Sequence, residues 1–216
     1  MSNQLIDYHE ITLLRHGESL ANQAQIVQGQ QDHPLSQLGR QQVKALATHW
    51  SELGKSFDLI ISSPLSRALE TAQTISEAIP CPIEEDKRWM ERNFGNAEGL
   101  DYDSVREWFD KNQDRSPFDI VFDSGESDWE VYIRAANALQ TLLRKPKGRY
   151  LVVSHGGILN AAVHCVLGIA LSTAMHRPRF QFTNTGHSTI QYNWKHFRWI
   201  IHSFNDVSHL NPTEDG

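Results

Sequence analysis

The chain has 216 residues, of which 39% are hydrophobic and 21% charged, and its formal net charge is −6. This length and apolar fraction are enough for one sizeable core, so we expect a single domain over residues 1–216. The acidic balance, without a run of about five Lys and Arg residues, argues against a nucleic-acid-binding or membrane-binding surface. No stretch approaches the roughly 18 uninterrupted apolar residues of a membrane-spanning helix.

Location and cofactors follow from what the sequence lacks. Residues 1–10 do not show the basic start, apolar stretch and small-residue cleavage site of a secretory signal, which favours the cytoplasm. Cys81 and Cys165 do not have the paired spacing of a zinc or redox motif. The 11 histidines form no HExxH-like pattern, so the sequence predicts no metal site and no cofactor.

The first part of the chain alternates short apolar runs with helical periodicity. Strands are predicted over residues 10–15, 57–61 and 83–85, and helices over residues 36–53 and 64–78. The first strand ends at His16-Gly17, where glycine allows a sharp turn. Ser63 is the expected cap of the second helix, and Pro64 is expected in its first turn.

The second part continues the alternation after a polar loop. A loop is predicted over residues 91–99, helices over 103–111, 127–143 and 158–167, and strands over 150–154, 188–194 and 197–204. We expect a lid-like insertion at about 91–130, a loose tail at 205–216 and a core of about 9–204. This order predicts an α/β fold, a three-layer α/β/α sandwich whose mostly parallel sheet has an antiparallel edge.

Three of the predicted strands end in residues suited to bind a phosphate group. They are followed by Arg15-His16-Gly17, by Ser62-Ser63-Pro64 with Arg67 one turn later, and by Ser154-His155-Gly156. Because the carboxyl ends of parallel strands meet at one edge of a sheet, we expect these residues to share a crevice. Arginine binds phosphate through two parallel hydrogen bonds and stays charged, which makes Arg15 and Arg67 the predicted phosphate ligands.

His16 is the predicted nucleophile. A neutral imidazole whose one N–H is held by a nearby carbonyl presents a lone pair on its other nitrogen, and this lone pair can attack phosphorus. His155 is expected to donate a hydrogen bond to the oxygens of the transferring group. The leaving oxygen needs a proton, for which Glu91 is the candidate acid. Four other carboxylates lie nearby in the sequence: Glu84, Glu85, Asp86 and Glu98.

The sequence around these positions resembles the signature blocks of the histidine phosphatase superfamily, also called phosphoglycerate mutase-like. The similar blocks, in the same order as in the family, are Leu13 to Ser19 with Asn22, Gln28 to Gln42, Ser62 to Ala72, Glu91 to Gly99, Gly125 to Ser127, and Val153 to Gly157. The resemblance implies a phosphoglycerate mutase-like fold without a metal and a phosphohistidine intermediate on His16. It implies a phosphate pocket of Arg15, Arg67 and His155, Glu91 as proton donor, and substrate contacts from Asn22, Gln28, Gly29 and Gly156.

The segment after the acid-bearing loop favours the phosphatase branch of this superfamily. Mutases of the superfamily usually have a longer insertion there, with basic residues for the substrate's second anionic group, whereas the segment 99–105 is short and acidic. We therefore expect a phosphomonoesterase that hydrolyses small phosphorylated metabolites. A cofactor-dependent phosphoglycerate mutase, for which Lys111 and Arg115 could supply charge, and a catalytically inactive phospho-ligand-binding protein stay open as alternatives. The expected partner is the small phosphorylated substrate, and a homodimer is also left open.

Overall fold

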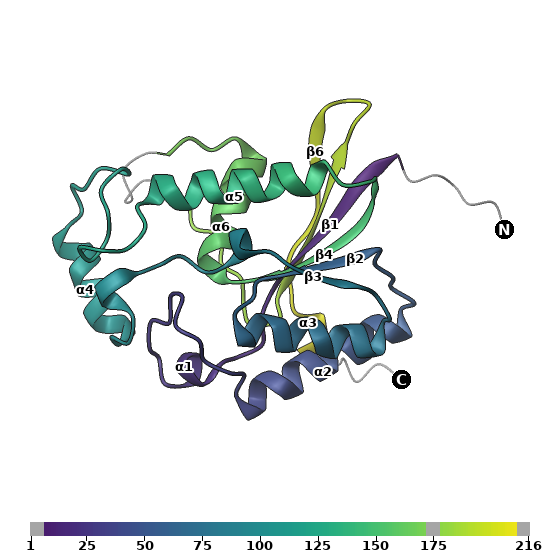
Figure 1. The fold of residues 1–216 in the computed structure, drawn as a ribbon, viewed down its shortest axis with the longest axis horizontal. Coiled ribbons are helices and arrows are strands. Elements are labelled where there is room, and N and C mark those ends of the chain that lie inside the picture. Colours follow the sequence, from purple (N-terminus) through teal and green to yellow (C-terminus); the bar gives the residue numbers. More distant parts are fainter. Residues whose placement is uncertain (1–6, 172–177, 211–216) are drawn as a thin grey trace.

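The computed structural model describes residues 7–171 and 178–210, and these residues contain a six-stranded sheet with the order β3-β2-β4-β1-β5-β6 (Figure 1). The strands are β1 Tyr8–Arg15, β2 Leu59–Ser62, β3 Ile83–Glu85, β4 Gly148–Ser154, β5 His187–Asn193 and β6 Arg198–Asp206. The first four strands are parallel, whereas β5 pairs antiparallel with β1, and β6 antiparallel with β5. The predicted mostly parallel sheet with an antiparallel edge is therefore confirmed.

Helices cover both faces of the sheet, which confirms the predicted three-layer fold. One layer contains α2 Gln37–Glu52 and α3 Ser66–Ala78, and the opposite layer contains α5 Asp128–Leu143 and α6 Gly156–Leu167 (Figure 1). Two short helices, α1 Leu20–Gln23 and α4 Tyr102–Lys111, lie beyond the sheet. Three 3-10 helices complete the described elements: Lys87–Trp89, Gly95–Ala97 and Ser208–Leu210. No helix in the described part of the chain is both long and apolar enough to span a bilayer.

The core lies in two hydrophobic clusters, one on each face of the sheet. Successive strand residues point to opposite faces, so Leu13 packs under α5 and α6 whereas Leu14 packs under α2 and α3. Val152 and Val153 of β4 divide in the same way, and all four side chains are fully buried. Burial of each such side chain stabilises the fold by about 1.5–3 kcal/mol. Because helices cover both faces of the sheet, the sequences of these strands are continuous apolar runs.

The start of α3 differs from the prediction. The helix begins at Ser66 with Leu65 as its N-cap, so Pro64 does not lie in its first turn. The hydroxyl of Ser63 accepts a hydrogen bond from the Leu65 N–H at 3.3 Å and also lies 2.7 Å from Nε2 of His155. Because Ser63 is engaged by the His155 ring, the chain continues for two residues before the helix begins.

The first residues of the predicted loose tail are ordered and packed, which corrects that prediction. Asn205 and Asp206 belong to β6, and the 3-10 helix Ser208–Leu210 follows. Within this helix His209 is buried, with its Nε2 2.9 Å from the hydroxyl of Thr185. This contact anchors the segment on the core, whereas residues 211–216 of the predicted tail lie outside the described residues.

Candidate active site

A cavity of about 840 Å³ opens at the carboxyl ends of the parallel strands. It is lined by the residues that follow β1, β2 and β4, as the topology of a parallel sheet requires. With one exception, His155, every residue predicted for the site lies on its wall: Arg15, His16, Asn22, Gln28, Gly29, Arg67, Glu91 and Gly156. The structure therefore gathers in one place residues that are up to about 140 positions apart in the sequence.

The ring of His16 is buried and fixed in one orientation at the end of β1. Its Nδ1 lies 2.6 Å from the carbonyl oxygen of Gly17, so Nδ1 carries the proton and Nε2 keeps its lone pair. Burial, followed by the charges of Arg67 and Arg15, lowers the pKa of His16 well below 6.5. The neutral imidazole is thus the form present at neutral pH, and this is the form that can attack phosphorus.

Gly17 is required by the close packing of this turn against α2. A Cβ at this position would lie 2.7 Å from both the carbonyl oxygen of Gly39 and a methyl group of Val43. Contacts this short would push β1 away from the helix. The glycine therefore lets the backbone beside His16 approach the start of α2 closely.

His155 lies beside His16 but beneath the cavity wall. The two ring centroids are 5.0 Å apart, and His155 is fully buried. Its Nδ1 accepts a hydrogen bond from Nε of Arg67 at 3.2 Å, which leaves Nε2–H to donate to the hydroxyl of Ser63. Burial, then the charges of Arg67, His16 and Arg15, lowers the pKa of His155 well below 6.5, so this ring is also neutral at neutral pH.

Arg15 and Arg67 place two guanidinium groups around His16. Arg67 is buried, and its Nη atoms donate to the carbonyl oxygens of Gly29 and Gln31, each at 2.9 Å. Burial lowers the pKa of Arg67 to about 10, so the group stays charged at neutral pH. Nη1 of Arg15 donates to the carbonyl of Phe182 at 2.7 Å, whereas its buried Nε has no hydrogen-bond partner among the described residues. A buried N–H without a hydrogen-bond partner is uncommon in a folded protein.

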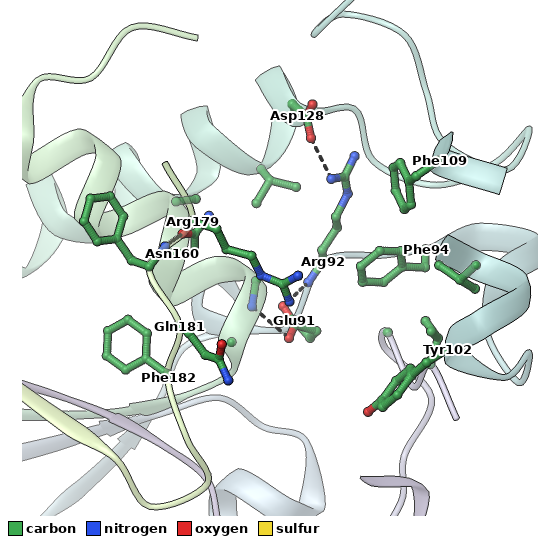
Figure 2. Close-up of a pocket in the computed structure, with 18 of the residues that line it drawn as sticks. Glu91, Arg92, Phe94, Tyr102, Phe109, Asp128, Asn160, Arg179, Gln181 and Phe182 are labelled. Carbon is green, nitrogen blue, oxygen red and sulfur yellow. Dashed lines mark hydrogen bonds and ion pairs between the residues drawn. The ribbon is translucent and has the colours of Figure 1, made fainter. Parts of the chain in front are cut away.

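Glu91 lies at the N-terminus of α6, where its carboxylate accepts three backbone hydrogen bonds (Figure 2). The donors are the N–H groups of Arg92, Gly157 and Ile158, at 2.8, 3.1 and 3.1 Å. A Cβ on Gly157 would lie 2.5 Å from Oε1 of Glu91, so only glycine lets the carboxylate reach the helix end. These contacts orient the carboxyl group on the cavity wall, within reach of the Coulomb field of both Arg15 and Arg67.

Arg134 of α5 holds the main chain that carries Glu91. Its guanidinium donates to the carbonyl oxygens of Arg88, Met90 and Glu91, at 3.0, 2.6 and 3.2 Å. The same group forms an ion pair of 2.6 Å with Glu126. Glu126 belongs to one of the blocks that resemble the family, but the sequence does not indicate that it acts through Arg134 on the acid-bearing loop.

Several contacts of the site were not identified from the sequence. Asn184 donates from Nδ2 to the carbonyl of His16 at 3.0 Å and to Oδ1 of Asn22 at 3.3 Å, linking His16 to a predicted substrate contact. Arg92 and Arg115 both pair with Asp128 at 2.6 Å on the cavity wall. The sequence around Asn184 shows only a polar, turn-rich stretch, and such a stretch does not predict which residues the Asn184 side chain contacts.

The described ranges 7–171 and 178–210 hold no group of three or more His, Cys, Asp or Glu side chains that could bind a metal ion.

Comparisons with known proteins match this geometry. A family model described as "Histidine phosphatase superfamily (branch 1)" matches residues 11–207. The "Probable phosphoglycerate mutase GpmB" of Escherichia fergusonii is 36% identical over 210 residues, which cover 94% of this chain and 95% of the relative. The same-named protein of Escherichia coli O1:K1 / APEC is 35% identical over the same shares.

Solved structures of phosphatases have the same fold. The phosphoserine phosphatase of Entamoeba histolytica, in complex with 3-phosphoglyceric acid, superposes with a TM-score of 0.80 at 28% identity, covering 94% of this chain and 99% of that one. A mycobacterial glucosyl-3-phosphoglycerate phosphatase in complex with VO3 gives a TM-score of 0.77 at 26% identity, covering 91% and 99%. The family model covers most of the chain and confirms the resemblance seen in the sequence blocks. The chain belongs to the histidine phosphatase superfamily, branch 1.

Proposed function

We propose that this chain is a phosphomonoesterase that hydrolyses small phosphorylated metabolites through a phosphohistidine intermediate on His16. The observation that carries the proposal is the state of the His16 ring. Its Nδ1–H is held by the carbonyl of Gly17, its pKa is lowered well below 6.5, chiefly by burial, and it lines a cavity beside two guanidinium groups. A neutral imidazole with a fixed lone pair next to preorganised cations is suited to attack a phosphate ester.

In the first step the phosphoryl group moves from the substrate to the protein. The guanidinium groups of Arg15 and Arg67, which both line the cavity, bind its oxygens. Nε2 of His16 forms a bond to phosphorus while the bond to the ester oxygen breaks. Glu91 gives its proton to that oxygen, so an alcohol leaves rather than an alkoxide.

In the second step water releases the phosphoryl group. Glu91, now a carboxylate held at the start of α6, accepts a proton from the attacking water. The water oxygen bonds to phosphorus, the bond to Nε2 breaks, and His16 returns to its neutral form. Inorganic phosphate then leaves the two guanidinium groups, and Glu91 is protonated for the next turnover.

Two ion pairs engage the cations that the sequence offered to a mutase reaction. A mutase must hold the substrate's second anionic group, for which Lys111 and Arg115 were the candidates in the sequence. Lys111 pairs with Glu107 at 2.6 Å and Arg115 pairs with Asp128 at 2.6 Å, so neither is a free cation in this structure. The names of the relatives do not decide between a phosphatase and a mutase. The curated relatives are named as mutases, whereas the structural neighbours are named as phosphatases.

A comparison of two rates tests the proposal. We expect phosphate release from a panel of phosphomonoesters to exceed the interconversion of 2- and 3-phosphoglycerate primed by bisphosphoglycerate. The reverse order would favour the mutase, and failure to hydrolyse any ester of the panel would favour the inactive binding protein. Cell fractionation and light scattering would test the cytoplasmic location and the homodimer, which stay predictions.

A further inference from the structure

We propose that Arg179 binds a carboxylate on the alcohol part of the substrate, which makes phosphomonoesters of hydroxy acids the preferred substrate class. The inference rests on the phosphatase function proposed above and deepens it. Arg179 was not among the site residues predicted from the sequence, and it follows α6 rather than the acid-bearing loop where the second-anion residues of mutases were sought.

The cavity wall has an excess of positive charge although the whole chain is acidic. Among the described residues it carries six arginines: Arg15, Arg67, Arg92, Arg106, Arg115 and Arg179. Only three carboxylates share this wall: Glu91, Asp110 and Asp128. A concave surface with this balance, in a chain of net charge −6, attracts anions locally.

Arg179 differs from the other five arginines in having no bonding partner within residues 7–171 and 178–210. Two of the five, Arg92 and Arg115, pair with Asp128, and Arg106 pairs with Asp103. Arg15 and Arg67 donate to backbone carbonyls. Arg179 makes no hydrogen bond or ion pair with any residue that the structure describes, so its guanidinium is available to a ligand.

The side chain of Arg179 points into the cavity toward Glu91 (Figure 2). Burial is the main cause that lowers the pKa of Arg15, and the positive charge of Arg179 is close enough to lower it further. The guanidinium groups of Arg15 and Arg179 thus repel each other across the same space, and the Glu91 carboxylate offsets part of this repulsion at Arg15. A substrate with two negative groups would relieve this repulsion, because one group would bind Arg15 and Arg67 while the other binds Arg179.

The backbone on both sides of Arg179 is anchored to the rest of the site. The carbonyl of Pro178 lies 2.9 Å from Nε2 of His164, and the N–H of Phe180 donates to Oδ1 of Asn160 at 2.8 Å. The carbonyl of Phe182 accepts the hydrogen bond from Arg15. Since the main chain is held at these points, binding orders only the side chain and loses little conformational entropy.

A carboxylate suits this position better than a second phosphate group. The planar guanidinium matches the two oxygens of a carboxylate, and one cation balances its single charge. A phosphate dianion would call for a second cation, and the remaining arginines of the wall are engaged as described. The opposite wall holds Phe94, Tyr102 and Phe109, where a carboxylate would find mostly apolar surface.

Two esters that differ only in the carboxylate test the proposal. Phosphoserine carries it, and phosphoethanolamine has a hydrogen atom in its place. We expect Arg179→Met to lower kcat/KM for phosphoserine by about 10- to 100-fold, mainly through KM, because a charge-assisted pair is lost. For phosphoethanolamine we expect a change within about twofold. Arg106→Met, which removes an ion-paired arginine of the same wall, should leave the ratio of the two esters unchanged.

Other outcomes would overturn the proposal in recognisable ways. An equal loss for both esters would mean that Arg179 binds the transferred phosphate or supports the fold. A selective loss for fructose 1,6-bisphosphate over fructose 6-phosphate, without one for phosphoserine, would identify the second group as a phosphate. If wild-type protein hydrolyses other esters but does not favour phosphoserine over phosphoethanolamine, this inference fails while the phosphatase function stands. If it hydrolyses no ester at all, both fail.

Discussion

Replacing Glu91 with glutamine isolates proton transfer from the other parts of the reaction. The glutamine side chain keeps the size of Glu91 but presents an NH₂ group to one of the backbone N–H groups that the carboxylate now binds. The loss of that hydrogen bond should destabilise the fold by about 1–3 kcal/mol. More importantly, the amide cannot protonate the leaving oxygen. For phosphoserine, whose leaving group is an alkoxide, kcat/KM should fall by about 10²–10⁴, or roughly 3–5 kcal/mol.

The leaving group separates this role from a merely structural one. 4-Nitrophenolate departs as a stable anion, so kcat/KM for 4-nitrophenyl phosphate should fall by less than about tenfold. The assay uses kcat/KM because this constant covers the steps up to the phosphohistidine, whereas kcat also includes its hydrolysis, in which Glu91 acts again. Glu85→Gln, the same change at an exposed position of β3, should alter neither ester. Equal losses for both esters would refute proton donation by Glu91, and no loss would assign it to another carboxylate.

Three further predictions concern histidine ionisation and backbone packing. Burial is the main cause that lowers the pKa of His187 and of His209 from 6.5 to about 4. Their contribution to the free energy of unfolding is therefore complete above about pH 6.5, and a few kcal/mol of it should be lost as the pH falls toward 4. Urea unfolding measures this loss, and a stability that is the same at pH 7 and pH 5 would contradict it. Gly39→Ala should lower Tm by roughly 5–10 °C, because its Cβ would meet the carbonyl oxygen of Glu18; an unchanged Tm would show that the turn can relax. In NMR spectra at pH 6, His16 should give the signals of a neutral imidazole protonated on Nδ1, and imidazolium signals would exclude the lowered pKa.

The fold and the central part of the site were accessible from the sequence for a physical reason. Apolar runs such as Leu13-Leu14 and Val152-Val153 identify strands buried on both faces, and alternation with helices fixes their parallel direction. Parallel strands end at one edge, so the residues after three of them had to meet there. His16, Arg15 and Arg67 could therefore be placed in one cavity without coordinates.

The rest of the site depends on packing that no local pattern records. Arg179 lines the cavity and Asn184 contacts the carbonyl of His16, both from the segment that leads into β5, and a turn-rich segment does not reveal where its side chains point. The position of His155 at a strand end was predictable, but not that its ring lies beside His16, held by Ser63 and Arg67. The contacts that hold these three groups are formed between elements far apart in the chain.

Trapping of the phosphorylated protein tests the role of His16 most directly. After incubation with a radiolabelled phosphomonoester and a rapid quench, we expect label on His16 that is stable in alkali and lost in acid. The label should be absent from His16→Ala and present in His202→Ala, a matched change at an exposed histidine of β6. Label that persists in His16→Ala, or wild-type protein that releases phosphate without ever becoming labelled, would contradict catalysis through His16.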